Sequence, residues 1–217
     1  MSQTTSQGTR ASKQEGQMGR WARYYDFLMV LMTFGREAKL RQMTVDLARI
    51  KEGDRVLEVG CGTGTLTLAA KRRAGASGEA TGIDIAPEMV AAAKRKADRR
   101  HASVSFQLGS IDNIPFPDNR FDAVMCSFMI FHMPDEVRTK GFAEIRRVLK
   151  PGGHLLILDF AWPDRMGYQR YHLRTLVPVL KGLSFDEVVL DKVKFMTWLG
   201  TGTAMGIWYL RATAPGS

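Results

Sequence analysis

The chain has 217 residues, of which 45% are hydrophobic and 24% charged, and its formal net charge at pH 7 is +9. This length and composition fit one soluble domain with its own hydrophobic core. Two cysteines exclude a disulfide framework, so we expect a reducing, cytoplasmic setting. The positive charge favours anionic partners such as a phospholipid surface, a nucleic acid or an acidic substrate.

The first 50 residues divide into two parts. Residues 1–17 are polar and predict a disordered N-terminal extension, without the apolar segment of a signal peptide. Residues 18–50 predict a helical cap. Its first helix, 21–34, is crowded with aromatic and aliphatic side chains, but its apolar run is far short of the ~20 residues that span a bilayer. We expect this helix to cover a pocket of its own domain, with contact to lipid as the alternative. A second helix is predicted over about 36–50.

A glycine-rich turn follows the first predicted strand. Residues 56–59 form a short, largely apolar run that predicts a buried strand, and Gly60, Gly62 and Gly64 follow at alternate positions. Glycine lets the backbone turn sharply and lets a ligand approach it closely. Thr65 opens a predicted helix, whose free N–H groups face the turn. The pattern predicts a nucleotide-type site on the first strand of a doubly wound α/β sheet.

Two carboxylates help to decide which nucleotide this site would bind. The second predicted strand, 80–85, contains Asp84 about 20 residues after the turn, where an acid can accept hydrogen bonds from both ribose hydroxyls. A dinucleotide-binding motif would have its third glycine at Thr65, whereas this chain has it one residue earlier. Glu58 beside the turn would repel a pyrophosphate and suits the cationic amino group of a methionine moiety. A nicotinamide-dependent oxidoreductase is therefore the weaker alternative.

Further strands and helices alternate along the chain. The helix that starts at Ala86 has a proline in its first turn and a basic run, 94–100, that predicts a solvated face. Residues 161–181 are basic and aromatic, and form either a lid over the site or an amphipathic helix covering the sheet. The other predicted elements are strands at 104–108, 121–127 and 154–160, a helix at 135–150, and a final pair of strands at 186–195 and 204–212.

Four motifs occur in order along the chain, at 56–64, 82–90, 113–124 and 147–153. Together they resemble the successive motifs of class I S-adenosylmethionine-dependent methyltransferases, over roughly residues 35–160. The resemblance implies a Rossmann-like, doubly wound seven-stranded α/β sheet, mostly parallel with a C-terminal antiparallel hairpin. Residues 18–217 would be a single domain, made of the helical cap, a cofactor-binding core at 51–160, and a lid with the terminal hairpin at 161–217.

The resemblance also implies S-adenosylmethionine as the cofactor, with S-adenosylhomocysteine as the product. The family's pattern has an acid after the third strand that holds the adenine amine; this chain has Ser110 there. The Ser110 hydroxyl, Asp112 or the backbone are the candidates to replace that acid. We expect the cofactor to contact Glu58, Gly60, Cys61, Gly62, Gly64, Asp84, Ile85, Met89, Ser110, Ile111 and Ser127.

The acceptor is expected beyond the fourth strand, since ligands of open α/β sheets bind outside the carboxyl ends of the strands. Residues 127–130 lack the Asn/Asp-Pro-Pro-aromatic motif of amine-directed nucleic-acid methyltransferases and form an apolar wall. The segments at 24–26 and 34–37 look like small bacterial phosphatidylethanolamine N-methyltransferases and quinone-biosynthesis C-methyltransferases. We therefore expect a hydrophobic or amphipathic small molecule, such as a phospholipid amine or a quinol; a soluble phenol, thiol or amine is the alternative.

Methyl transfer from a sulfonium is an in-line displacement that relies on positioning, and it needs a base only if the nucleophile keeps its proton. The candidate side chains near the methyl group are His132, Tyr24, Tyr25, Asp159 and Tyr171. His132 is either catalytic or a structural residue of the apolar wall.

The partners expected are a small molecule or lipid and, peripherally, an anionic membrane. The charge, the helix at 21–34 and the basic residues of 165–174 motivate the membrane contact. No carboxylate cluster suggests a magnesium site, and two cysteines cannot supply the thiolates of an arsenite site. No strand carries a basic-aromatic platform, so nucleic acid is not expected, and a nucleic-acid-binding module is the last alternative. The sequence leaves the oligomeric state open.

Overall fold

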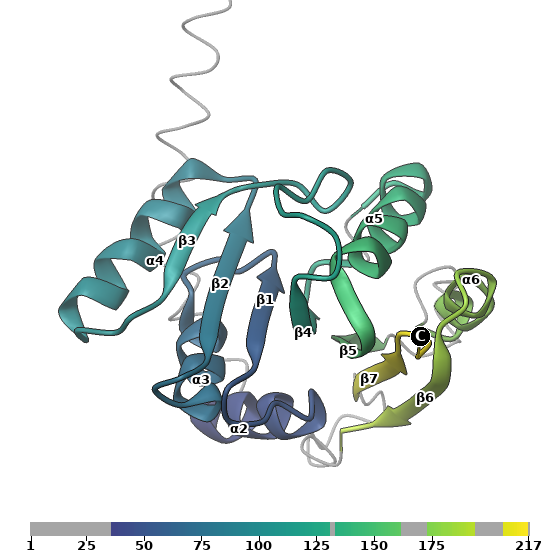
Figure 1. Ribbon diagram of the computed structural model, residues 1–217, viewed down its shortest axis with the longest axis horizontal. Helices are drawn as coiled ribbons and strands as arrows, with labels where there is room; N and C mark the ends of the chain where they lie inside the picture. Colours follow the sequence, from purple (N-terminus) through teal and green to yellow (C-terminus); the bar gives the residue numbers. More distant parts are fainter. Residues whose placement is uncertain (1–35, 131–132, 162–172, 194–205, 217) are drawn as a thin grey trace, which may run out of the picture.

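The computed structural model describes residues 36–130, 133–161, 173–193 and 206–216 (Figure 1). They form a seven-stranded sheet with the strand order β3-β2-β1-β4-β5-β7-β6. Strands β1 to β5 pair in parallel, while β7 is antiparallel to both β5 and β6. The predicted mostly parallel sheet with a C-terminal antiparallel hairpin is confirmed. The strands are β1 (Arg55–Val59), β2 (Glu79–Asp84), β3 (Ser105–Leu108), β4 (Phe121–Ser127), β5 (Leu149–Ala161), β6 (Asp186–Lys192) and β7 (Gly206–Thr213).

Helices cover both faces of the sheet (Figure 1). On one face lie α2 (Glu37–Leu47), α3 (Thr65–Ala74) and α4 (Pro87–Arg99); on the other lie α5 (Asp135–Val148) and, after a short 3-10 turn at Leu173–Thr175, α6 (Leu176–Gly182). Successive side chains of a strand point to opposite faces, so Val56 packs with α2 and α3 while Leu57 packs with α5 and α6. This two-sided burial is why the central strands are nearly continuous apolar runs.

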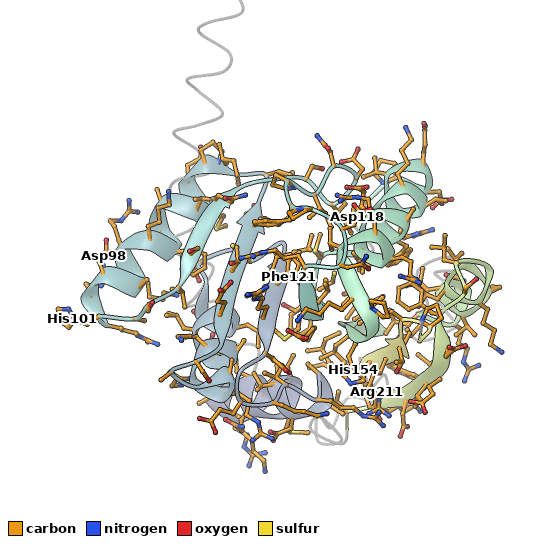
Figure 2. The ribbon with its side chains drawn as sticks, in the orientation of Figure 1. Asp98, His101, Asp118, Phe121, His154 and Arg211 are labelled. Carbon is orange, nitrogen blue, oxygen red and sulfur yellow. The ribbon has the colours of Figure 1, made fainter. Side chains whose placement is uncertain are left out.

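Two phenylalanines pack against each other in the core on the side of the sheet that α5 covers. Phe121, at the start of β4, is fully buried and meets Phe116 edge to face with ring centroids 5.1 Å apart (Figure 2). Such pairs stabilise a core beyond the area that they bury. His154 and Arg211 lie toward the end of the β5–β7 pair at which β5 begins (Figure 2).

The boundaries differ from the predicted ones where the chain reverses. The helix predicted over about 36–50 ends at Leu47, since Arg49 adopts a left-handed φ of 56°. The helix predicted to reach residue 150 ends at Val148, and β5 starts at Leu149, earlier than expected. Pro151 accounts for part of this, because the residue before a proline is pushed out of the helical region.

The parallel register brings four strand ends to one edge of the sheet. Val59 lies beside Ile83 of β2 and Cys126 of β4, and Ser127 lies beside Leu158 of β5. The glycine turn, Asp84, Ser127 and Asp159 therefore share this edge, where ligands of such sheets bind.

Several predictions lie outside the described residues. These are the N-terminal extension, the helix at 21–34, most of the predicted lid, and the side chains of Tyr24, Tyr25, His132 and Tyr171. Among the described residues, no helix combines the length and apolar composition needed to cross a bilayer.

Candidate functional site

Three consecutive amides attach the glycine turn to the end of β2. The N–H groups of Gly60 and Cys61 both donate to the Ile83 carbonyl, at 2.8 and 2.9 Å, and the Gly62 N–H donates to the Asp84 carboxylate at 2.8 Å. Gly60, Gly62 and Gly64 have φ values of 70°, 52° and 76°, in the left-handed region that favours glycine. The alternate glycines are thus required by the backbone of this turn.

Asp84 is held in a fixed orientation at this edge. One carboxylate oxygen accepts the Gly62 N–H and the other accepts the Ala86 N–H at 2.9 Å. Each oxygen keeps a second lone pair, so the carboxylate can still accept two ligand hydroxyls. The next side chain, Ile85, is 74% exposed. An oriented carboxylate beside an exposed aliphatic side chain suits the ribose and the base of a nucleoside.

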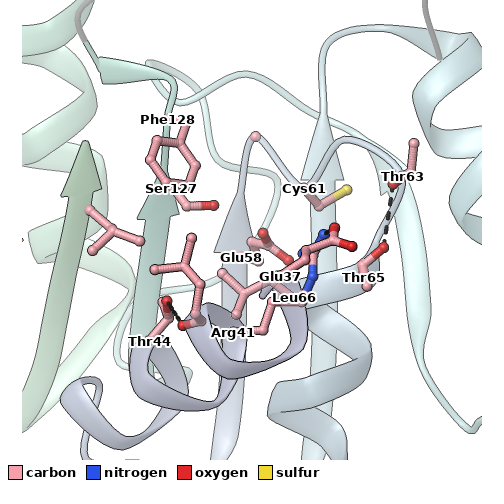
Figure 3. A pocket seen from close by; sticks show the side chains of 13 residues that line it. Glu37, Arg41, Thr44, Glu58, Cys61, Thr63, Thr65, Leu66, Ser127 and Phe128 are labelled. Atoms are coloured by element: carbon pink, nitrogen blue, oxygen red, sulfur yellow. Dashed lines mark hydrogen bonds and ion pairs between the residues drawn. The ribbon is translucent and has the colours of Figure 1, made fainter. Parts of the chain in front are cut away.

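A cavity that is open to solvent, with about 480 Å³ of space not filled by protein atoms, lies between the glycine turn, α2 and the ends of β4 and β5 (Figure 3). Four predicted residues line it: Glu58, Gly60, Cys61 and Ser127. Thr63 and Thr65 could have been predicted to line the cavity, because they lie within or beside the glycine motif, whereas no sequence pattern pointed to the lining residues on α2. Phe128, which also lines the cavity, belongs to the predicted apolar wall at 127–130. The lining residues not predicted are Glu37, Leu40, Arg41, Thr44, Thr63, Thr65, Leu66 and Leu158.

Glu58 is the buried carboxyl of this cavity, with only 2% of its surface exposed. Burial raises its pKa from the ordinary value of 4.5 to about 7, although the Thr67 hydroxyl, which donates to it, and the nearby Arg41 both oppose the rise. Arg41 is itself ion-paired with Glu37 one helical turn away. A carboxyl that titrates near neutrality can become ionised when a cationic group enters the cavity.

The backbone turns sharply after β4. Phe128 has a φ of 55°, which is strained for an aromatic residue. Its N–H donates to the Leu158 carbonyl at 2.8 Å, and the Ile130 N–H donates to the Asp159 carboxylate at 3.1 Å. Asp159 is buried and is not among the residues that line the cavity. Its carboxylate holds the turn, and its predicted part in proton transfer stays a prediction.

The residues expected around the adenine lie outside the cavity. The Ser110 hydroxyl donates to Asp112, which places a carboxylate beside the position where the family has its acid. Ile111 is buried in the main core against Gly141. Met89 is half-buried in the first turn of α4. These positions stay predictions for cofactor contact.

Comparison with known proteins decides the family. Residues 56–153 match the family model described as a methyltransferase domain. Over 162 residues the chain is 39% identical to the demethylmenaquinone methyltransferase of Thermus thermophilus, an alignment that covers 73% of this chain and 72% of the relative. The chain belongs to the class I S-adenosylmethionine-dependent methyltransferases. The methyltransferase is therefore an enzyme with S-adenosylmethionine as its cofactor, as the sequence motifs predicted.

The chain is also similar to a second relative and to a solved structure. The methyltransferase is 39% identical over 165 residues to the ubiquinone/menaquinone biosynthesis C-methyltransferase of Geobacter sulfurreducens, covering 73% of this chain and 63% of the relative. A solved S-adenosylmethionine-dependent methyltransferase from Aquifex aeolicus has the same fold, with a TM-score of 0.69 and 23% identity, over 90% of this chain and 98% of that one.

Glu58→Gln tests the buried carboxyl through the stability of the cofactor-free methyltransferase. Between pH 4.5 and about 7 the native state keeps a proton on Glu58 that the unfolded chain has released, so rising pH destabilises the native state by about 3 kcal/mol in total. The glutamine amide does not ionise. We expect the variant to gain stability relative to the parent over this interval and to be more stable at pH 8.

Urea unfolding from pH 5 to pH 8 measures this difference. Glu136→Gln on α5, where the glutamate side chain is 81% exposed, is the matched control and should unfold with the parent's pH profile. Parallel profiles for Glu58→Gln and the parent would contradict the assignment.

Proposed function

We propose that this methyltransferase transfers the methyl group of S-adenosylmethionine to a ring carbon of a quinol that carries an apolar side chain. The observation that carries the proposal is the 39% identity to the demethylmenaquinone methyltransferase over 72% of that relative. The apolar side chains of Leu40, Phe128 and Leu158 in the cavity support a hydrophobic acceptor. The lack of an amine-directed motif after β4 argues against a nucleic-acid base as acceptor.

The residues present fit the cofactor. Asp84 offers two oriented oxygens to the ribose hydroxyls, and Ile85 offers an apolar surface to the adenine. Glu58 offers a carboxylate to the ammonium of the methionine moiety. Ser110 with Asp112 offers an acceptor for the adenine amine. When bound, the cofactor supplies an activated methyl group.

The protein's remaining task is to orient the acceptor and to accept a proton. Attack by a ring carbon is favoured when the quinol hydroxyl loses its proton, and the methylated carbon must then release its hydrogen as a proton. His132, Tyr24, Tyr25 and Tyr171 are the proposed groups for these transfers. Asp159 is proposed as a positioning residue, since it binds the N–H of Ile130, two residues before His132 in the chain.

An assay of S-adenosylhomocysteine release, run with each of a panel of acceptors in turn, tests the proposed acceptor. We expect kcat/KM for a prenylated naphthoquinol to exceed that for phosphatidylethanolamine, simple phenols, thiols and amines by about 100-fold. The oxidised form of the same quinone should be inert, because its ring is not nucleophilic.

Asp84→Ala serves as the control that activity comes from this site, since loss of the carboxylate should weaken cofactor binding by about 2–4 kcal/mol. Preference for an amine, phenol or thiol over the quinol would refute the proposed acceptor.

We also propose that the enzyme meets its acceptor at an anionic membrane surface. Two cations lie over the ring of Trp208: the Arg174 guanidinium at 5.5 Å and the Lys192 ammonium at 4.9 Å from its centroid. Trp208 lies beside Asp159 in the β5–β7 register, so this cationic cluster lies at the same edge of the sheet as the site. Each basic residue near an anionic leaflet contributes about 1 kcal/mol. The net charge of +9 acts in the same direction.

Sedimentation with liposomes of rising anionic content tests the membrane proposal. We expect binding that grows with anionic lipid and weakens with salt. The double variant Arg174→Gln/Lys192→Gln should bind about 30-fold more weakly, because two basic residues are removed. Arg99→Gln/Arg100→Gln, at the exposed end of α4, removes the same charge and should bind like the parent. Protein that stays in the supernatant at low salt and high anionic content would refute the proposal.

A further inference from the structure

One residue of the basic run on α4 behaves differently from the others. Lys94, Arg95, Arg99 and Arg100 are exposed, as a solvated face predicts. Lys96 is half-buried and reaches across to the glycine turn. Its ammonium donates to the hydroxyl oxygens of two threonines, at 2.8 Å to Thr63 and 2.5 Å to Thr65.

These two threonines form part of the wall of the cavity (Figure 3). Thr63 belongs to the turn itself, and Thr65 begins α3. Each hydroxyl oxygen accepts a hydrogen bond from Lys96, so each hydroxyl hydrogen must point elsewhere. The two oxygens are 3.5 Å apart, and a bond between them uses one of the two hydrogens at most. Lys96 therefore directs both hydroxyl hydrogens away from itself, which is the orientation in which a ligand acceptor can receive them.

We propose that Lys96 is a positioning residue that orients the Thr63 and Thr65 hydroxyls toward the carboxylate of the cofactor's methionine moiety. The proposal rests on the cofactor site proposed above and is independent of the acceptor that is methylated. Lys96 acts from behind the wall of the cavity: it sets the direction of the donors and adds a positive charge behind them.

The charges around the cavity match a zwitterion. Glu58 supplies a carboxyl for the ammonium of the methionine moiety, and the Lys96–threonine group supplies donors and positive charge for its carboxylate. Arg41 also lies on the cavity, but its charge is balanced by the ion pair with Glu37. A nucleoside that lacks the amino-acid portion has no group for this donor pair to bind.

Calorimetric titration of Lys96→Met with two ligands tests the proposal. Methionine keeps the alkyl stem of the lysine and removes its ammonium. We expect the Kd for S-adenosylhomocysteine to rise about tenfold, since a charge-assisted interaction of this kind contributes on that scale. The Kd for 5′-methylthioadenosine, which has the adenosine and the sulfur but no amino-acid portion, should change less than about twofold.

Lys94→Met is the matched control, because it removes the same charge from an exposed position on the same helix and should leave both Kd values unchanged. Equal losses for the two ligands in Lys96→Met would show that lysine merely holds the turn together, and no loss for either would show that it does nothing for the ligand. Either result overturns the proposal.

Thr65→Val supplies a second test that does not depend on the folding of Lys96→Met. It should weaken the binding of S-adenosylhomocysteine but not that of 5′-methylthioadenosine, as Lys96→Met should. The double variant should lose less affinity than the product of the two single losses, because both changes disable one donor group. Fully independent losses would contradict the coupling of Lys96 to the threonine.

Discussion

The attachment of the glycine turn to the end of β2 places most of the groups at the site. Three consecutive amides of the turn bind one backbone carbonyl and the carboxylate of Asp84. This arrangement requires left-handed backbone at the glycines and orients Asp84 toward the ligand side. It also sets where α3 begins, and so where Thr63 and Thr65 meet the lysine of α4. Parallel pairing of β1 with β2 and β4 then brings the apolar turn after β4 to the opposite side of the same cavity.

Two features of the site lower the stability of the cofactor-free protein. Burial keeps the pKa of Glu58 near 7, so the cofactor-free protein is less stable at neutral pH than it would be with an amide there. In the proposed complex, the ammonium of the cofactor would offset that desolvation. The strained backbone of Phe128 is a second such place, and it persists because the Leu158 carbonyl and the Asp159 carboxylate hold the residues around it. Strain and buried charge therefore meet within one cavity, as expected of a site selected for binding.

The sequence predicted the sheet and its ligand edge because strand burial, glycine spacing and carboxylate spacing are local patterns. Glu58 and Asp84 could be located from those patterns alone. The contribution of α2 could not, because the spacing of apolar residues shows which side of a helix is buried but not where the helix lies on the sheet; Arg41 was missed for this reason. Lys96 was missed because a run of basic residues does not reveal which one points inward. The predicted catalytic side chains other than Asp159 lie outside the described residues.

Counting the protons released when the cofactor binds tests most directly the claim that Glu58 receives its ammonium. Calorimetric titration of S-adenosylmethionine at pH 7, in buffers of different ionisation enthalpy, gives that number. Glu58 is about half protonated at this pH, so its ionisation should release about half a proton more from the parent than from Glu58→Gln, which accounts for the ligand's own titration. Equal proton release from the two proteins would contradict the account.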